Sequence, residues 1–372
     1  ISDAHDRNTN SMVFHTCVRT NLCIVGQTWK KIKYATIPFM NLKIGIVGLA
    51  NVGKSTLFNA LLKKQVSFAA NYPFATIEPN IGVVPVPDDR LQKLAEITKE
   101  EEKMDKLPPL VPAVVEFVDI AGLVKGASEG QGLGNKFLAH IREVDIICHV
   151  IRFFEDPSIV HVEGGPDPDR DREIVETELI LADLQTLNKQ KDSFADLKAA
   201  LNSGKMAKDV IMDPEEVRDL QLLTMKPVMY VANVSEKQLA EKTGMLAICA
   251  ETESQLAGLS DEEQKEYLKS LGLEFSGLDR LIKKAYEMLG LLSFLTCGPI
   301  EARAWTIERG TKAPQAAGVI HTDFEKKFIK ADIVSFGEFN GWKKAREIGK
   351  VRSEGKEYVM RDGDVVEFKV GS

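Results

Sequence analysis

The sequence lacks the features that mark membrane, disulfide-bonded and repeat proteins. No apolar run reaches the roughly 20 residues that a membrane-spanning helix needs. The 5 cysteines are odd in number and show no metal-ligand spacing, which favours a reducing compartment over a disulfide framework. Internal repeats and low-complexity tracts are absent as well. What remains is a chain of 372 residues, 28% charged and 44% hydrophobic, a composition typical of a globular protein with two or three domains.

A large positive charge is also missing. The formal net charge is −7, so the chain as a whole is not a polycation that would bind nucleic acid through charge alone. The charge is nevertheless uneven. From Pro299 to the end, 14 Lys and Arg face 12 Asp and Glu, which makes this part slightly positive on an otherwise acidic chain.

The most informative stretch is Gly-Leu-Ala-Asn-Val-Gly-Lys-Ser at 48–55. It follows an apolar run at 42–47 that predicts a buried strand, and it opens into a helical pattern at 56–62. Strand, glycine-bounded turn and helix form the context of a phosphate-binding loop, in which backbone N–H groups and the helix N-terminus bind phosphate. Lys54 should act catalytically by reaching the β- and γ-phosphates, and the Ser55 hydroxyl should bind Mg²⁺. A chance glycine turn before a helix is the alternative. The nucleotide-binding residues expected in this stretch are Asn51, Val52, Gly53, Lys54, Ser55 and Thr56.

Further residues complete the expected Mg²⁺ and γ-phosphate site. Asp119 ends a strand pattern at 114–119 and precedes Gly122 by three residues, like the metal-side aspartate of P-loop enzymes. Gly122 can offer its N–H to a γ-phosphate because no side chain is in the way. Thr76 lies in a loop after the P-loop helix, where switch enzymes place a second hydroxyl on Mg²⁺; a plain loop threonine is the alternative. The glycine-rich run at 124–135 should be mobile until a ligand orders it, as a switch requires.

Strand and helix patterns alternate along the middle of the chain, which predicts an α/β fold with a doubly wound parallel sheet. Ligands of such sheets bind at the carboxyl ends of the strands, where the P-loop, Asp119 and Asn233 all fall. The prolines of the first strand pattern after the P-loop helix place it at or near the sheet edge. The strand patterns of this sheet lie at 42–47, 81–86, 114–119, 145–152, 227–233 and 245–250.

The rest of the chain divides around this sheet. Residues 1–39 have no clear period and contain acidic residues, which argues against a transit peptide. The long helical pattern in 171–225, broken near Gly204, predicts two antiparallel helices that form a hairpin arm; ordinary core helices are the alternative. Residues 291–372 combine strand patterns with a helix at 321–330 into a small α+β module. The expected parts are an N-terminal extension outside the fold (1–39), a P-loop NTPase domain (40–170 and 226–290), the helical arm (171–225) and the C-terminal module (291–372).

With these residues in place, the chain resembles the YchF/Obg-like ATPase family of Obg-related P-loop NTPases, from about Met40 to Val370. The most specific stretches are 48–56, 71–80, 119–135, 303–307 and 313–327. The resemblance implies a C-terminal TGS domain with the ubiquitin-like β-grasp fold and a coiled-coil arm at 171–225. This chain departs from the family by being short in the arm and again between Asn233 and Met245.

The P-loop residues and the resemblance together imply a Mg²⁺-dependent ATPase that turns over slowly and acts as a nucleotide-dependent switch in translation. We expect a cytoplasmic monomer that binds ATP and ribosomes or structured RNA, with no membrane partner. An Obg-type GTPase is one alternative, and a ribosome-binding or RNA-binding module with little turnover is another. The combination of Lys54, Ser55, Thr76 and Asp119 favours hydrolysis, because a purely structural site would not need all four.

The segment after the 227–233 strand pattern predicts a preference for ATP. Guanine readers carry Asn-Lys-x-Asp there, and the Asp accepts hydrogen bonds from guanine N1–H and the exocyclic amine. Here the sequence is Asn233-Val234-Ser235-Glu236, without the Lys and with a longer acid. Adenine offers an acceptor at N1 and a donor at N6, so it cannot make the pair of hydrogen bonds that guanine makes with that Asp. We expect Asn233, Val234 and Glu236 to bind the base.

Two further expectations concern turnover. The residue after Gly122 is Leu123, where Ras-like enzymes carry a water-orienting glutamine, so intrinsic hydrolysis should be slow. The resemblance points to a histidine in a mobile loop as the catalytic group, and the match here is His161; a satisfied loop histidine is the alternative. Asn51 could hold K⁺ against the phosphates in place of an arginine finger, or could simply cap its own loop.

The C-terminal module carries a dense set of cations that predicts docking on ribosomal or other structured RNA, with salt-dependent affinity. A solvated face of mixed charge is the alternative. The resemblance favours RNA, and nucleotide-driven ordering of the glycine-rich loop would couple ATP to docking. These cations are Lys326, Lys327, Lys330, Lys343, Lys344, Arg346, Lys350 and Arg352.

Overall fold

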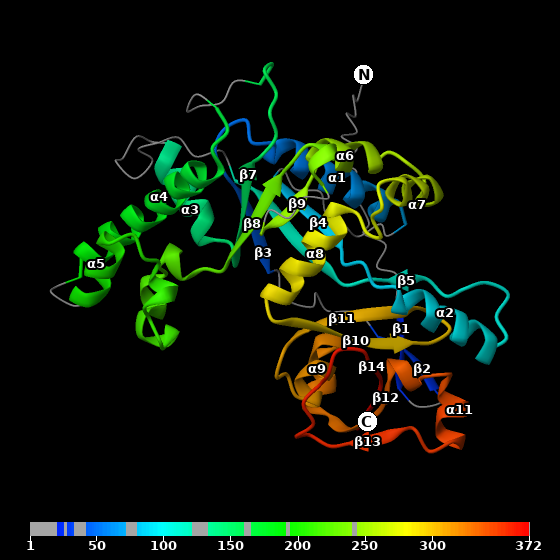
Figure 1. Cartoon of the computed structure of the whole chain (residues 1–372). Coiled ribbons are helices and arrows are strands. Elements are labelled where there is room, and N and C mark those ends of the chain that lie inside the picture. The colour runs from blue at the N-terminus through cyan, green and yellow to red at the C-terminus, as the bar shows by residue number, and fades with distance from the viewer. Residues whose placement is uncertain are drawn as a thin grey trace, which may run out of the picture.

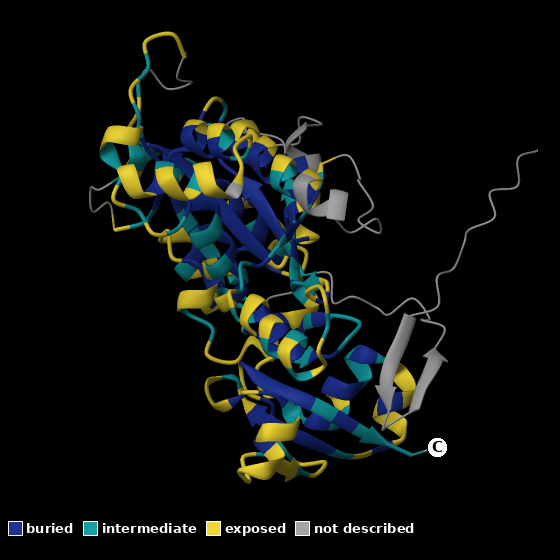
Figure 2. Cartoon of the chain, turned by 90° about the vertical axis from the view of Figure 1, so that its right-hand side faces the viewer, coloured by how far each residue is buried: buried dark blue, intermediate teal, exposed yellow. Residues whose placement is uncertain are grey.

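The computed structural model describes residues 21–25, 28–32, 42–71, 80–120, 133–159, 165–190, 194–239 and 244–371. Three of the expected site residues, Thr76, Gly122 and His161, lie outside these ranges, as does most of the glycine-rich run. The described part contains two six-stranded sheets, which form the upper and lower halves of Figure 1. Buried residues fill most strands of both sheets, and most exposed residues lie on the surrounding helices and loops (Figure 2).

The first sheet has the order β4-β6-β3-β7-β8-β9. Its strands are β3 (Lys43–Val47), β4 (Ile81–Pro85), β6 (Val114–Asp119), β7 (Ile146–Arg152), β8 (Val228–Asn233) and β9 (Leu246–Ile248). All of them run parallel except β4, which lies at the edge and pairs antiparallel with β6. The expected parallel sheet and the edge position of 81–86 are therefore confirmed.

Helices pack against this sheet and bury an apolar core. Helix α1 (Lys54–Asn71) contacts β3, β4, β6 and α6 (Ala250–Leu256), and α4 (Pro168–Asn188) contacts β7. All seven residues of β7 are buried, as a central parallel strand requires. This half also contains α3 (Leu133–Arg142), α7 (Asp261–Ser270), α8 (Gly277–Met288) and the 3-10 turn η5 (Glu236–Gln238).

The region expected to form two antiparallel helices contains only one long helix. Asp167 caps α4 by accepting a hydrogen bond from the Arg170 N–H, and α5 (Ala195–Asn202) follows. The returning part consists of three 3-10 helices, η2 (Ala207–Asp209), η3 (Pro214–Leu220) and η4 (Leu223–Met225). The backbone leaves the helical conformation at Gly204, which has a φ of +83° two residues after α5, and again at Gln221, which has a φ of +45° after η3. The return is fixed by the Asp183 carboxylate, which accepts hydrogen bonds from the Leu223 and Thr224 backbone N–H groups at 2.8 Å.

The second sheet has the order β13-β12-β14-β10-β11-β5. Its strands are β5 (Leu110–Val111), β10 (Leu291–Cys297), β11 (Ala302–Glu308), β12 (Phe328–Ser335), β13 (Arg352–Glu354) and β14 (Asp364–Val370). Helices α9 (Ala313–Ile320), α10 (Thr322–Lys326) and α11 (Trp342–Glu347) and the turn η6 (Phe336–Glu338) accompany it. The helix expected at 321–330 is too long, because Phe328 pairs with Val370 and begins β12.

A segment from between β4 and β6 completes this second sheet. Helix α2 (Arg90–Glu101) buries Leu91, Leu94, Ala95 and Thr98, and it packs against β10 and β11. The two-residue strand β5 then pairs parallel with β11. The apolar core of the first sheet consequently continues through α2 into the second sheet.

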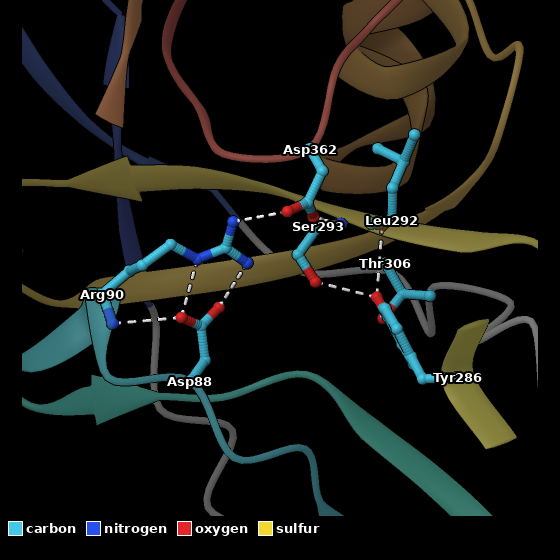
Figure 3. A network of polar contacts seen from close by, with 7 residues as sticks. All are labelled: Asp88, Arg90, Tyr286, Leu292, Ser293, Thr306 and Asp362. Carbon is cyan, nitrogen blue, oxygen red and sulfur yellow. Dashed lines mark hydrogen bonds and ion pairs between the residues drawn. The ribbon is translucent and has the colours of Figure 1, made fainter. Parts of the chain in front are cut away.

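Polar contacts fasten the same segment to the C-terminal half. Figure 3 shows the Arg90 guanidinium between Asp88 and Asp362, to which it donates hydrogen bonds of 2.7 Å. The Asp362 carboxylate also accepts the Ser293 backbone N–H at 2.9 Å. At the other end of α2, the Glu101 carboxylate accepts hydrogen bonds from the first two backbone N–H groups of α11, those of Trp342 and Lys343.

Part of the expected N-terminal extension has secondary structure. Strands β1 (Asn21–Val25) and β2 (Thr28–Ile32) form a two-stranded antiparallel sheet, and β1 contacts β14. The other residues of 1–39 lie outside the described part. None of the helices in the described ranges combines the length and the apolarity of a membrane-spanning segment.

Candidate nucleotide-binding site

The loop between β3 and α1 has the backbone shape of a phosphate-binding loop. Gly48 and Gly53 adopt φ values of +150° and +98°, and Asn51 lies in the left-handed region with a φ of 62°. A Cβ on Gly48 would lie 2.4 Å from the Val150 carbonyl oxygen, and one on Gly53 would lie 2.2 Å from the Asn233 side-chain nitrogen. Only glycine fits either position, because backbone conformation and space both exclude a side chain.

Lys54 is held inside this loop. The side chain is 7% exposed, and its Nζ donates a hydrogen bond to the Leu49 carbonyl oxygen at 2.5 Å. Burial lowers the pKa of Lys54 to about 8, and the charge of Asp119 opposes this shift. Burial likewise raises the pKa of Asp119, opposed by the charge of Lys54. The hydroxyl-bearing residues Ser55 and Thr56, which follow in the first turn of α1, are exposed.

Asn233 connects the P-loop to the start of α6, on the side of the site where the base is expected. Its side-chain Nδ2 donates to the Val52 carbonyl oxygen at 2.9 Å, and its Oδ1 accepts from the Ala250 backbone N–H at 3.0 Å. Because Asn233 is buried and ends β8, one amide fixes three chain segments at the carboxyl edge of the sheet. Asn51, Val52, Gly53, Lys54 and Asn233 are therefore brought together as expected.

A cavity of about 680 Å³ opens above these residues. Three segments form its walls: the P-loop with the start of α1, the loop after β7, and the ends of β8 and β9. It is lined by Asn51, Gly53, Lys54, Ser55, Thr56, Phe154, Glu155, Asp156, Ile159, Asn233, Val234, Ser235, Cys249, Ala250 and Glu251.

Glu236, expected to bind the base, is not among the lining residues. Its carboxylate instead accepts hydrogen bonds from the Thr252 hydroxyl at 3.2 Å and the Tyr267 hydroxyl at 2.8 Å. Val234 and Ser235 do line the cavity, although the Ser235 hydroxyl is hydrogen-bonded to Gln238. The sequence reasoning also missed Glu251, which follows β9 and lies on the same wall.

Arg152 is a second residue that the sequence reasoning missed. It is 1% exposed at the end of β7, and its guanidinium donates hydrogen bonds to the backbone carbonyls of Phe154, Asp156 and Ile159 at 3.1–3.2 Å. The same guanidinium lies 4.4 Å from the centre of the Phe154 ring. Arg152 thereby shapes the loop that forms one wall of the cavity, which a strand-end arginine in the sequence does not reveal.

The described residues contain no cluster of three or more His, Cys, Asp or Glu side chains that could hold a metal ion. This finding does not conflict with Mg²⁺, which usually takes one or two carboxylates together with water and phosphate oxygens. Ser55 and Asp119 supply oxygen donors of the kind that Mg²⁺ prefers. The third expected ligand, Thr76, and the expected γ-phosphate and catalytic groups, Gly122 and His161, lie outside the described residues.

Family models match both halves of the chain. Residues 43–192 match a model described as "50S ribosome-binding GTPase", and residues 291–371 match the C-terminal YchF GTPase model, described as "Protein of unknown function (DUF933)". The ribosome-binding ATPase YchF of Bacillus subtilis (strain 168) is 48% identical over 371 residues, covering 89% of this chain and 99% of the relative. The chain belongs to the YchF family.

Other members agree with this assignment. The ribosome-binding ATPase YchF of Escherichia coli O157:H7 is 48% identical over 368 residues, covering 88% of this chain and 99% of the relative. The structure of the Schizosaccharomyces pombe YchF GTPase matches with a TM-score of 0.76 at 38% identity, covering 89% of this chain and 98% of that one. This YchF-family chain therefore has the mixed α/β P-loop GTPase fold.

The cations expected to bind RNA divide into two groups in this YchF-family chain. Four of them form ion pairs, namely Lys330 with Asp332, Arg346 with Glu367, Lys350 with Glu338, and Arg352 with Glu354. The other four are exposed and have no acidic partner among the described residues: Lys326, Lys327, Lys343 and Lys344. The second group is the part of the set whose charge is free to meet phosphate.

Proposed function

We propose that this chain is a Mg²⁺-dependent ATPase that acts as a nucleotide-dependent switch on ribosomes. The observation that carries the proposal is the Asn233 amide, which joins the P-loop to the base side of a cavity large enough for a nucleotide. The names of the bacterial relatives, ribosome-binding ATPases at 48% identity, support both halves of the proposal.

The described residues can take distinct roles toward ATP. Lys54, freed from the Leu49 carbonyl, would neutralise the β- and γ-phosphates, while P-loop N–H groups hold the phosphate oxygens. Ser55 and Asp119, together with Thr76, would hold Mg²⁺, which would supply positive charge to neutralise the phosphates. Gly122 would hold the γ-phosphate through its N–H. Asn51 could add K⁺, and equal rates in NaCl and KCl at matched ionic strength would argue against that.

Hydrolysis should be slow, because Leu123 cannot hydrogen-bond an attacking water. His161 is our candidate for the group that acts on this water. A single-turnover assay of γ-phosphate release tests the proposal, with Lys54→Ala as the inactive control. His161→Ala should lower kcat and leave nucleotide affinity nearly unchanged. Release that is the same in wild type and Lys54→Ala would leave the chain as a binding module with little turnover.

A GTPase is the alternative, favoured by the description of the fission yeast relative as a YchF GTPase. Against it, this chain has neither the Lys nor the Asp of the guanine-reading motif after Asn233. Isothermal titration with ATP and with GTP, both with Mg²⁺, separates the two. GTP binding at least as tightly as ATP would overturn the ATPase proposal.

The ribosomal half of the proposal rests on the C-terminal module, which we take to be a TGS domain of the β-grasp type, and on the helical arm at 171–225. Lys326, Lys327, Lys343 and Lys344 are its proposed phosphate contacts. Replacing all four by Gln should lower ribosome co-sedimentation and flatten its salt dependence, because each phosphate contact releases counterions. Replacing the four ion-paired cations, Lys330, Arg346, Lys350 and Arg352, by Gln removes the same number of charges and is the matched control. Identical docking with ATP and with ADP would contradict the nucleotide-dependent switch and would leave ribosome binding as the remaining part of the proposal.

The remaining parts of the proposal follow from the same assignment. We take 40–170 and 226–290 as the NTPase domain and 291–372 as the C-terminal module, in a cytoplasmic monomer. Light scattering of the purified chain tests the monomer, and a mass twice that of the chain would contradict it.

A further inference from the structure

Acidic side chains line the cavity that is proposed to bind a polyanionic nucleotide. Three are present, and the Asp156 carboxylate already accepts hydrogen bonds from the Ser158 backbone N–H and hydroxyl. Glu155 and Glu251 are both exposed, and neither has a hydrogen-bond or ion-pair partner among the described residues. Glu155 belongs to the loop after β7, whereas Glu251 follows β9, where the base is expected. Because like charges repel, a carboxylate without a partner disfavours a phosphate beside it, so its better neighbour in a bound nucleotide is the base.

The other polar side chains at the base end each have a hydrogen-bond partner within the protein. Asn233 uses its amide nitrogen on Val52 and its amide oxygen on Ala250. The Ser235 hydroxyl is bonded to Gln238. The Glu236 carboxylate accepts the Thr252 and Tyr267 hydroxyls through one oxygen, Oε2, and it does not line the cavity. Among the described side chains that end β8 and β9, Glu251 is therefore the acidic acceptor left for a ligand.

We propose that Glu251 accepts a hydrogen bond from the exocyclic 6-amino group of adenine and thereby favours ATP over GTP. An ionised carboxylate is an acceptor only. Adenine presents a donor at position 6, whereas guanine presents a carbonyl oxygen there. With guanine, two acceptors, its O6 and the Glu251 carboxylate, would therefore face each other without a proton between them. This inference rests on the proposed ATPase function, and it moves the base-reading role from Glu236 to Glu251.

The test removes each partner of the proposed bond in turn. Wild type, Glu251→Ala and Glu236→Ala are titrated with ATP and with purine riboside triphosphate, which lacks the 6-amino group. Wild type should bind ATP about tenfold more tightly than the analogue, as expected for one charge-assisted hydrogen bond at an exposed site. Glu251→Ala should bind the two nucleotides equally, while Glu236→Ala should keep the wild-type ratio. A ratio measured within one variant is insensitive to changes in folding.

Two further variants make the test specific. Glu155→Ala removes another acid that lines the same cavity and should keep the wild-type ratio. Glu251→Gln supplies an amide donor for guanine O6 and should bind GTP severalfold more tightly than wild type does. A ratio that survives in Glu251→Ala, or that is lost in Glu236→Ala, would overturn the inference. Failure of the proposed function itself would look different, since wild type would then bind neither nucleotide or would prefer GTP.

Discussion

The two sheets of this protein differ in what covers them. The parallel sheet leaves its carboxyl edge open, and side chains from that edge form the walls of the nucleotide cavity. The second sheet is covered on one side by its own helices α9 and α10, and its other side shares a core with α2, which comes from between β4 and β6. The second sheet is thus completed by a segment of the first half. Sequence boundaries between the halves do not coincide with the boundaries of their cores.

The largest expected effect comes from cutting the chain at the sequence boundary. A fragment of residues 291–372 would lose α2 and β5 and would expose the apolar face that Leu91, Leu94 and Ala95 cover. Burial of a large aliphatic side chain contributes about 1.5–3 kcal/mol, which is a large share of the stability of so small a module. We expect the fragment to lack a cooperative thermal transition, as measured by circular dichroism.

The control for this experiment is the same fragment with residues 86–111 supplied as a peptide or by fusion, which should restore cooperative unfolding. Cooperative unfolding of the bare fragment would show that its core is independent of α2, and the comparison between the sheets would then fail.

A smaller effect on stability is expected from adding a side chain at a glycine of the P-loop. In Gly48→Ala, the added Cβ would meet the Val150 backbone carbonyl at 2.4 Å in a backbone conformation that suits glycine. We expect a loss of about 3 kcal/mol in the free energy of unfolding of the full chain. Gly82→Ala is the matched control, since its Cβ would lie 3.4 Å from the Phe58 ring. Equal denaturant midpoints for the two variants would show that the loop can relax.

The fold was predictable where local pattern and tertiary packing agree. The all-apolar run of β7 and the glycine turn before Lys54 each specify one structure. Phe324 and Phe328, however, are spaced both for one helix face and for the start of a new strand, and only the pairing of Phe328 with Val370 decides between them. The two-residue strand β5 has no period of its own, since it exists through its pairing with β11.

In the candidate site, too, the roles that could be predicted are those that depend on local sequence. The roles expected of Lys54 and Asn233 depend on residues within the motif or at the tips of adjacent strands. The position of Glu236 depends on Tyr267, 31 residues further along the chain, so the sequence could not show that its carboxylate is occupied. Arg152 has three backbone carbonyls as partners, and no residue type in the sequence marks such a contact.

The contact between α2 and α11 gives the next prediction. The Glu101 carboxylate accepts the N–H groups of Trp342 and Lys343, so Glu101→Ala leaves the start of α11 uncapped. We expect a loss of about 1–2 kcal/mol in the free energy of unfolding. Glu100→Ala changes an exposed residue on the same helix and should cost much less. A similar cost for both variants would mean that general charge on α2, rather than the link between the halves, matters.

The smallest expected effect is a dependence of ATP affinity on pH. It concerns ligand binding by the half that contains the parallel sheet, whereas the predictions above concern the stability of the fold. Lys54 has a pKa lowered to about 8 by burial, so its charged fraction falls as the pH rises through that value. Binding of ATP needs the charged form of Lys54, and the bound phosphates keep the proton on the Lys54 amine. Affinity for ATP should therefore fall about twofold from pH 7 to pH 8 and more steeply above it, because half of the free amine is neutral when pH equals pKa. Lys54→Arg keeps a charge throughout this range, so its affinity, whatever its level at pH 7, should not decline. Titrations of ATP at fixed Mg²⁺ measure this, and the same decline in both proteins would assign the pH dependence to a group other than Lys54.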